Sequence, residues 1–323
     1  MAVCVGIDVS KAKLDVAVLV EGKIKRTKVV SNDTAGFVQL LGWLESHVPG
    51  GVNTSHVCME ASGVYHEAVA TFLYDHKVRV SVVNPLQIKR YAEAKLMRCK
   101  SDQADARLIA QFAAAESPPP WQAPPMSLRQ LQALVARLDT LLGMQRSELN
   151  RLQTAHEAVQ PSIQAVLDSL KEAIEQVREQ IRRTVDDDPD LKRRSELLES
   201  IPGLGERTIP QLLAYIGSPE RFTTVKALAA YAGLNPAPRS SGSSLNVTHG
   251  TSRHGHRQLK RILYFPAMVA GRFNPVVKAF WERLQEQRKP GKVIVVACMH
   301  KLLSLVYGVL KSGKPFDSRL SSA

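Results

Sequence analysis

The sequence predicts an α/β domain at the N-terminus, followed by a long helical arm and a mainly α-helical C-terminal domain. Three observations support this prediction: apolar β-rich runs alternate with helical patterns over residues 1–116, a proline-rich segment follows, and helical spacing of apolar residues dominates from residue 127 onward. A chain of 323 residues exceeds the usual size of one hydrophobic core, so two or three domains are expected.

The N-terminal domain is predicted to begin with a buried strand, residues 3–10, which carries Asp8 near its end. Further β-rich runs with short turns predict an antiparallel meander, after which helices and strands alternate. A second strand ends at Glu60, and Ser101 is a suitable N-cap for a helix that carries Asp102 and Asp105 on one face. The other expected elements are strands at 14–20, 23–30, 56–59 and 78–83, helices at 34–47, 63–76 and 101–115, and a turn at 84–85 that leads into a basic segment.

Composition changes mark the remaining boundaries. Residues 1–116 are the candidate catalytic domain, and residues 117–126 are a proline-rich linker that follows it. Residues 127–190 have the apolar spacing of two long helices, which are broken at Gln160-Pro161. These helices predict a coiled-coil arm, either folded as a hairpin within one subunit or paired between subunits. Residues 191–323 form the expected C-terminal domain.

The charge predicts a polyanionic partner. The net charge is +13, and it is unevenly spread: residues 1–116 carry 14 basic and 12 acidic side chains (+2), whereas residues 250–323 carry 14 and 3 (+11). A basic excess concentrated in one region is typical of proteins that bind nucleic acid.

The cysteine pattern and the N-terminus predict a cytoplasmic protein. The four cysteines are far apart and form no CxxC pair, which favours reduced thiols over a zinc or redox site; they are Cys4, Cys58, Cys99 and Cys298. The N-terminus has no secretory pattern, and the apolar segment 293–299 is expected to be too short to span a membrane.

The C-terminal domain contains two candidate phosphate-binding features. The turn Ile201–Gly205 resembles a helix-hairpin-helix, in which Gly203 and Gly205 would let the backbone approach a phosphate, although an ordinary interhelix turn fits equally. The second feature is a small polar loop, Arg239–Ser244, that precedes a cluster of basic residues. The candidates for backbone phosphate contacts are Arg239, Arg253, Arg257, Lys260 and Arg261.

The order of the N-terminal elements, with acids at the ends of the first and fourth strands and on a following helix, predicts an RNase H-like fold. Four carboxylates can converge only if a cation neutralises them, and hard divalent ions such as Mg²⁺, with Mn²⁺ as an alternative, prefer oxygen ligands. Paired divalent ions promote phosphoryl displacement, so the reaction class expected is phosphodiester chemistry. The ligand candidates are Asp8, Glu60, Asp102 and Asp105.

Other interpretations of these acids remain open. Asp15 competes with Asp8 but is ranked lower because no strand end places it at the crevice, Asp102 suits a helix start, and Glu60 could be a turn residue. The first strand also suits a sugar kinase or actin-like ATPase, although the sequence has no second Asp-x-Gly strand turn.

The chain resembles DEDD-type insertion-sequence transposases of the IS110 family, relatives of the Piv DNA invertases. The matching stretches are GIDVSKAKLDVAV, CMEASGVYHEAVA, NPLQIKRYAEA, KSDQADARLIA, ESIPGLGERTIPQLLAYIG and YAGLNPAPRSSGSS. The resemblance implies a RuvC-like domain with four metal-binding acids, a coiled-coil arm and a C-terminal transposase domain with a catalytic serine.

Further expectations come from the resemblance alone. It implies that Ser241 is the nucleophile, although Ser240, Ser243 and Ser244 crowd the same loop. It also implies a bridge RNA that pairs with donor and target DNA, dimers and tetramers with a composite site, and a location in the bacterial cytosol or nucleoid. The alternatives are a metal-dependent nuclease or junction resolvase that uses water, and a non-catalytic RNA- or DNA-binding scaffold.

Overall fold

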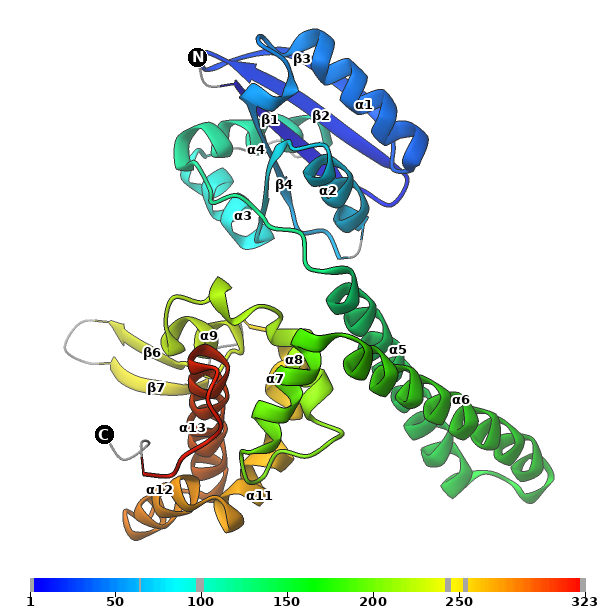
Figure 1. Ribbon diagram of the computed structural model, residues 1–323, viewed down its shortest axis with the longest axis vertical. Coiled ribbons are helices and arrows are strands. Elements are labelled where there is room, and N and C mark those ends of the chain that lie inside the picture. The colour runs from blue at the N-terminus through cyan, green and yellow to red at the C-terminus, as the bar shows by residue number, and fades with distance from the viewer. Residues whose placement is uncertain (1–2, 64, 97–101, 242–244, 252–254, 320–323) are drawn as a thin grey trace. The chain divides into compact units, whose positions relative to one another are not determined.

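The computed structural model describes residues 3–63, 65–96, 102–241, 245–251 and 255–319, with the backbone alone for 102–103 and 236–251. The chain forms two compact units, Met1–Ala123 and Pro124–Ala323, and the break falls in the proline-rich segment (Figure 1). The four-part domain division remains a prediction.

The first unit is built on a five-stranded mixed sheet of order β3-β2-β1-β4-β5. Strands β1, β2 and β3 are antiparallel, whereas β4 is parallel to β1 and β5 is parallel to β4. This order and these directions are those of an RNase H-like fold, as predicted. The elements are β1 (Val3–Val9), β2 (Lys13–Val20), β3 (Lys23–Ser31), α1 (Thr34–His47), β4 (Ser55–Glu60), α2 (Tyr65–Asp75), β5 (Arg79–Val83), α3 (Pro85–Ala94) and α4 (Asp102–Glu116).

The two faces of the sheet are covered by different helices (Figure 1). The odd-numbered residues of β1, such as Val5 and Ile7, pack in one apolar cluster with Leu40 of α1 and Leu73 of α2. Cys4 belongs to a second cluster on the other face, together with Cys58 of β4, Ile88 of α3 and the α4 residues Leu108, Ile109, Ala110, Phe112 and Ala113. Because side chains alternate along a strand, Gly6 and Asp8 also lie on the α4 face.

Helix α3 corrects the predicted turn and basic segment after β5. Asn84 is its N-cap and Pro85 its first residue, and the Asn84 side chain and Gln87 form a capping box. Proline is well suited to this position because its missing N–H would have no partner there.

The proline-rich segment is held along the edge of the sheet. The backbone N–H of Trp121 donates to the carbonyl of Val80 at 2.7 Å, and the Ser81 hydroxyl donates to the carbonyl of Pro119 at 2.8 Å. Nε2 of the His56 ring lies 2.7 Å from the same hydroxyl. The segment therefore belongs structurally to the first unit up to residue 121.

The second unit is mainly α-helical, as predicted, with one two-stranded hairpin. Its long helices α5 and α6 are joined by a short connection and pack side by side within one chain (Figure 1), which selects the hairpin over pairing between subunits for this contact. Their coiled-coil character remains a prediction. The elements are α5 (Met126–Thr154), α6 (Gln160–Asp187), α7 (Pro189–Glu199), α8 (Ile209–Ile216), α9 (Val225–Tyr231), β6 (Pro236–Ser241), β7 (Leu245–Thr251), α10 (Arg257–Ile262), α11 (Tyr264–Phe273), α12 (Pro275–Glu286) and α13 (Gly291–Ser312).

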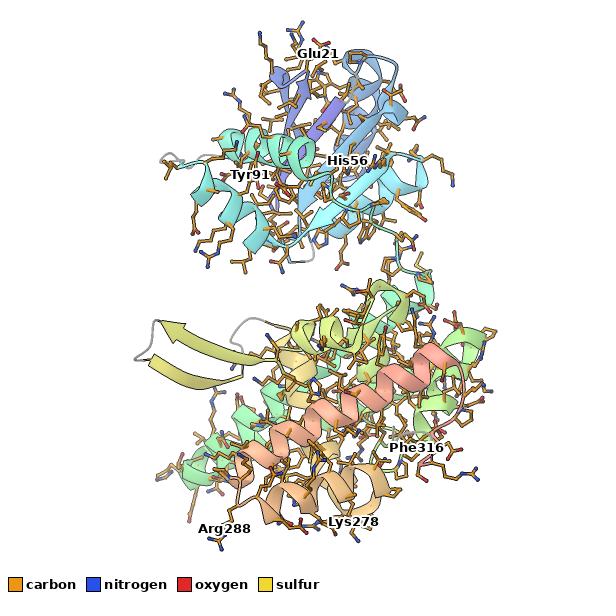
Figure 2. All side chains as sticks on the ribbon, turned by 90° about the vertical axis from the view of Figure 1, so that its left-hand side faces the viewer. Glu21, His56, Tyr91, Lys278, Arg288 and Phe316 are labelled. Carbon is orange, nitrogen blue, oxygen red and sulfur yellow. The ribbon has the colours of Figure 1, made fainter. Side chains whose placement is uncertain are left out.

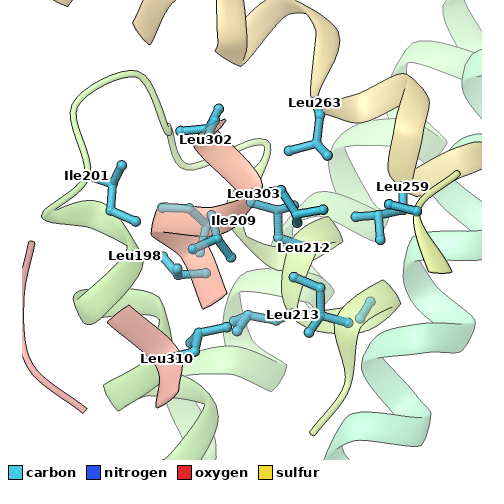
Figure 3. Packing of buried hydrophobic residues seen from close by; sticks show 14 of the residues in the cluster. Leu198, Ile201, Ile209, Leu212, Leu213, Leu259, Leu263, Leu302, Leu303 and Leu310 are labelled. Carbon is cyan, nitrogen blue, oxygen red and sulfur yellow. The ribbon is translucent and has the colours of Figure 1, made fainter. Parts of the chain in front are cut away.

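Helix α13 lies in the core of this unit, where Leu302, Leu303 and Leu310 belong to the same buried apolar cluster as Ile209 and Leu212 of α8 (Figure 3). By length and composition α13 could cross a membrane, so the expectation that its apolar segment is too short is wrong: the helix continues past His300 and Lys301. However, 56% of its most apolar window is buried in the protein, as in a core helix.

The predicted serine loop is also corrected. Residues 236–241 and 245–251 pair as antiparallel strands, and Ser241 is the last residue of β6, opposite Leu245. The pairing depends on backbone groups of two short, mostly polar segments, in which only Leu245 and Val247 alternate with polar residues, too short a pattern to reveal a strand in the sequence.

Candidate active site

Asp8 and Glu60 lie at the same end of two neighbouring parallel strands. The last register pair between β1 and β4 is Ile7 with Met59, and each acid follows by one residue. Both are partly buried, and both lie on the α4 face. Adjacent strands are about 4.8 Å apart, so Asp8 and Glu60 are neighbours at this end of the sheet.

Asp15 joins these two acids on the same face. It pairs directly with Asp8 across the antiparallel β1–β2 ladder, a position in which Cβ atoms are about 5 Å apart. Its side chain is only 4% exposed, and Lys13 forms an ion pair with it at 3.0 Å. From the sequence alone, Asp15 ranks below Asp8 as a candidate ligand. A signal for its position is present in the sequence, because the short turn after Val9 sets the register that places Asp15 opposite Asp8.

The start of α4 approaches this group of acids. At Gly6 the helix backbone lies directly on β1, because a Cβ added there would stand 2.1 Å from the carbonyl oxygen of Ala106 and 2.3 Å from the amide nitrogen of Ala110. The later turns of α4 share the apolar cluster of Cys4, at the beginning of β1. The first turn, with Asp105, therefore lies toward the Asp8 end.

The described acids can also be compared with the geometry that a metal ion requires. Within the described part of the chain, no three His, Cys, Asp or Glu side chains converge closely enough to hold a metal ion. The backbone of Asp102 begins α4, but its side chain lies outside the described residues.

Two buried polar atoms lie in the segment that follows Glu60. The hydroxyl of Ser62 and Nδ1 of His66 have no hydrogen-bond partner among the residues that the structure describes. Burial lowers the pKa of His66, which favours the neutral ring. Asn32 ties this segment to the end of β1, since its amide donates to the carbonyls of Ser10 and Tyr65 at 2.8 and 3.2 Å. The sequence patterns did not identify Ser62 or His66, and only their burial singles them out.

The hairpin that carries Ser241 is anchored at its base. The ring of His256 contacts the rings of Tyr215 and Tyr231, with centroid separations of 4.7 and 5.5 Å. The backbone N–H of His256 donates a hydrogen bond to the backbone carbonyl of Tyr231 at 2.6 Å. Gly255 packs so closely on Gly233 that an added Cβ would be 2.4 Å from its nitrogen. The segments on both sides of the hairpin are thus fastened to each other.

An ion pair links this base to the helical arm. Asp139 of α5 accepts hydrogen bonds from the Tyr215 hydroxyl at 2.5 Å and from the Arg261 guanidinium at 2.7 Å. Burial and the Asp139 carboxylate raise the pKa of Tyr215, so its hydroxyl stays protonated. Lys260 donates to the carbonyl of Gly233 at 3.2 Å.

The predicted phosphate-binding residues therefore differ in their surroundings. Arg261 and Lys260 make contacts within the protein, Gly203 packs against Ala270 of α11 with φ +104°, and Gly205 faces open space. Arg257 is exposed at the start of α10. Arg253 and the side chain of Arg239 lie outside the described residues.

The comparisons with known proteins agree along nearly the whole chain. Residues 5–161 match a family model named DEDD_Tnp_IS110 and described as "Transposase", and residues 195–282 match the model "Transposase IS116/IS110/IS902 family". The "Pilin gene-inverting protein" of Moraxella lacunata is 33% identical over 322 residues and covers 98% of each chain.

More distant similarities were also found. The "Transposase for insertion sequence element IS1111A" of Coxiella burnetii is 24% identical and covers 79% of this chain and 77% of its own length. The solved structure titled "Thermus thermophilus RuvC structure" is 20% identical, with a TM-score of 0.27 over 35% of this chain and 92% of that one. With the two family models and the Moraxella relative covering the chain almost end to end, the protein belongs to the IS110 family of transposases and recombinases, which are DNA-processing enzymes.

Proposed function

We propose that the protein cleaves, exchanges and religates DNA strands through a covalent serine intermediate, with divalent metal ions bound by the acids of the first unit and target choice directed by a structured RNA. The observation that carries the proposal is the register of β1 and β4, which places Asp8 and Glu60 together beside the start of the helix that bears Asp102 and Asp105. Family membership supports DNA as the substrate.

The chemical type of the proposed ligands, carboxylate oxygens, suits a hard divalent cation. Asp8 and Glu60 supply carboxylate oxygens at one end of the sheet, and Asp105 lies on the first turn of the helix packed over it. Mg²⁺ prefers such ligands, and Mn²⁺ shares the preference. The ligands proposed are Asp8, Glu60, Asp102 and Asp105. A bound divalent ion would stabilise negative charge on the attacking and leaving oxygens of phosphoryl transfer.

Ser241 is the proposed nucleophile. Its hydroxyl oxygen would form a new P–O bond to the scissile phosphate while one existing P–O bond breaks, and the serine proton would pass to the released deoxyribose hydroxyl. The number of phosphoester bonds is conserved, so a second hydroxyl could reverse the step and religate without ATP. The β6–β7 hairpin presents Ser241 at the end of a strand whose base is fixed by His256, which favours a defined position for the attack.

The guide RNA, the oligomer and the location rest on other observations. The motifs that resemble bridge-RNA-guided recombinases support guidance by an RNA, and the basic residues of the second unit suit contacts with a nucleic-acid backbone.

A dimer or tetramer with a composite site would bring the acids of one subunit to the serine of another. The cytoplasm, where bacterial DNA lies, is the location that follows from a DNA substrate.

The test is a covalent adduct assay with labelled DNA that spans the element's own ends, in Mg²⁺. The wild type should form a protein–DNA adduct that survives denaturation, and Ser241→Ala should abolish both the adduct and recombination. Ser240→Ala is the matched control, since it removes a neighbouring hydroxyl of the same strand. An undiminished adduct with Ser241→Ala would overturn the serine assignment.

Two further arms of the assay separate the alternatives. A nuclease or resolvase that uses water would give free ends with both serine variants, and a scaffold would bind DNA without cleavage in Mg²⁺ or Mn²⁺. For RNA guidance, the protein should be purified from cells that express its flanking DNA, and the RNA that copurifies should be sequenced. Recombination that is undiminished after RNA removal would contradict guidance by RNA.

A further inference from the structure

Helix α11 presents an apolar stripe to solvent. Phe265, Val269 and Phe273 are spaced four residues apart, so they lie on one helix face, and they are 73%, 44% and 71% exposed. The ring of Tyr264 packs edge-to-face on Phe265, with centroids 5.5 Å apart. Among the described residues, no other helix has so many large apolar side chains so exposed in a single short segment.

The stripe residues are exposed although α11 itself is firmly packed against the rest of the second unit. The opposite face of α11 carries the buried Pro266, Ala267 and Ala270, and Gly203 lies against the backbone of Ala270. Gly271 is in close contact with the ring of Trp281 in α12. The stripe is therefore held rigidly outward, and large exposed apolar patches on a rigid surface mark sites of interaction.

The basic residues near the stripe favour a negatively charged partner. No Asp or Glu occurs between Glu220 and Glu282, a stretch that contains nine Lys and Arg residues. Arg272 of the stripe's own helix and Arg257 of α10 are exposed, and Lys278 projects from α12 (Figure 2). A second copy of the chain docked by this surface would set like charges against each other, whereas a polyanion with aromatic groups would match both the charge and the rings.

A single DNA strand has this chemistry. Its unpaired bases stack on exposed aromatic side chains, and its phosphates pair with Arg and Lys. Phe265 and Phe273 are eight residues apart, or about 12 Å along the helix, which corresponds to roughly three or four steps of a strand with 3.4 Å between bases. A duplex hides the faces of its bases and could not use the rings in this way.

We propose that the α11 stripe, Phe265, Val269 and Phe273, binds a segment of unpaired DNA by base stacking. The inference rests on the proposed function, because strand cleavage and exchange separate the strands of a duplex and leave a segment to be held.

The experiment measures the binding of the full-length protein to a fluorescein-labelled 12-nucleotide DNA strand by anisotropy at fixed salt. The double substitution Phe265→Leu/Phe273→Leu keeps apolar side chains but removes the rings, and affinity should fall at least about tenfold, since a lost base–aromatic stack typically costs between about fivefold and 150-fold. Phe265→Tyr/Phe273→Tyr should stay within about twofold of the wild type. Leu149→Ala, which removes an exposed apolar side chain from α5, is the matched control and should have no effect.

Three results would overturn the proposal. The first is wild-type affinity of the Leu double variant for the single strand. The second is a loss of affinity for a 12-nucleotide RNA that is much larger than the loss for the DNA strand, which would assign the stripe to RNA. The third is dissociation of an oligomer by Phe265→Ala/Phe273→Ala in sedimentation velocity, with DNA binding unchanged, which would assign it to a second copy. Binding to the oligonucleotide requires no catalysis, so failure of the serine mechanism and failure of this inference are separate outcomes.

Discussion

Asp15 shows how a single buried side chain can alter the description of the candidate site. Burying an isolated carboxylate costs several kcal/mol of free energy. Lys13 offsets part of this cost for Asp15 through an ion pair at 3.0 Å, but the Lys13 side chain is itself partly exposed. On its other side Asp15 faces Asp8 across the ladder. Like charges directly opposite each other repel, so a cation near Asp8 relieves the repulsion in addition to binding its own ligands.

We therefore expect Asp15→Asn to weaken metal activation while the fold is kept. The amide has nearly the same shape, but one negative charge beside Asp8 is lost, and the Mg²⁺ concentration for half-maximal DNA cleavage should rise about tenfold, which corresponds to about 1.4 kcal/mol. Cleavage would be followed over a Mg²⁺ titration. Asp33→Asn, at the exposed N-cap of α1, is the control; an unchanged Mg²⁺ midpoint in Asp15→Asn would refute the electrostatic role.

His256 is a second residue whose surroundings set its charge. Burial lowers its pKa from 6.5, and Nδ1 accepts a hydrogen bond from the backbone N–H of Leu259 at 3.1 Å, which a protonated Nδ1 could not do. A histidine with a lowered folded-state pKa contributes full stability above the unfolded pKa, and this contribution is lost as the pH falls below about 6.5.

The prediction is that His256 titrates below pH 6.5 in the folded protein. Its ring proton signals would be followed by NMR from pH 8 to 5, with His256→Gln used for assignment. A midpoint for His256 at or above 6.5 would show that the hairpin base does not hold the ring neutral.

At the scale of elements, the contact between α4 and β1 connects packing to the site. The helix approaches the sheet closely only because residue 6 lacks a side chain, and the same helix carries Asp102 and Asp105. Anything that lifts α4 from β1 also moves these acids away from Asp8 and Glu60. Packing and proposed catalysis therefore depend on the same contact.

Gly6→Ala should accordingly impair both stability and cleavage. The new methyl group would meet backbone atoms of Ala106 and Ala110, which cannot rotate away, and overpacking of this kind costs about 3 kcal/mol. Unfolding would be measured in urea, and DNA cleavage below the transition. Gly42→Ala in α1 is the matched control, because nothing lies within 4 Å of its added Cβ, and it should stabilise by about 1 kcal/mol. Equal stability of the two variants would refute the close-packing argument.

At the scale of the whole molecule, the two units differ in charge. The first unit is nearly balanced, while the basic excess lies in the C-terminal part of the second. The proposed metal site lies in the first unit, whereas the positive charge needed to bind phosphates lies in the second. This separation suits a protein whose chemistry needs acids that would otherwise repel its substrate.

The affinity for duplex DNA should fall steeply with salt. Binding that neutralises six or more phosphates loses about a thousandfold or more between about 50 and 200 mM salt, through release of counterions. The measurement is a salt series of binding constants. Arg257→Gln should reduce the slope of the logarithmic plot by about one, whereas Asp33→Asn should leave it unchanged. A flat salt response would contradict binding through phosphates.

Most of the fold followed from local patterns. The strands of the first unit and the two long helices of the second were predicted within a few residues, because alternation and helical spacing of apolar residues are local signals. The position of Asp8 and Glu60 at strand ends followed from the same patterns. Helix α3 was missed although Asn84, Pro85 and Gln87 form a capping signal that the sequence contains.

The sequence by itself thus determined the order of the strands in the first unit, the uneven distribution of charge and the family of the protein. Tertiary structure alone decided that Asp15 is buried, that Arg261 pairs with Asp139, that Gly203 packs on α11, and that Ser241 ends a strand. Asp139 and Arg261 are 122 positions apart, and β6 and β7 contain only the short alternation of Leu245 and Val247 with polar residues. Such contacts depend on which surfaces meet after folding, and no local periodicity encodes them.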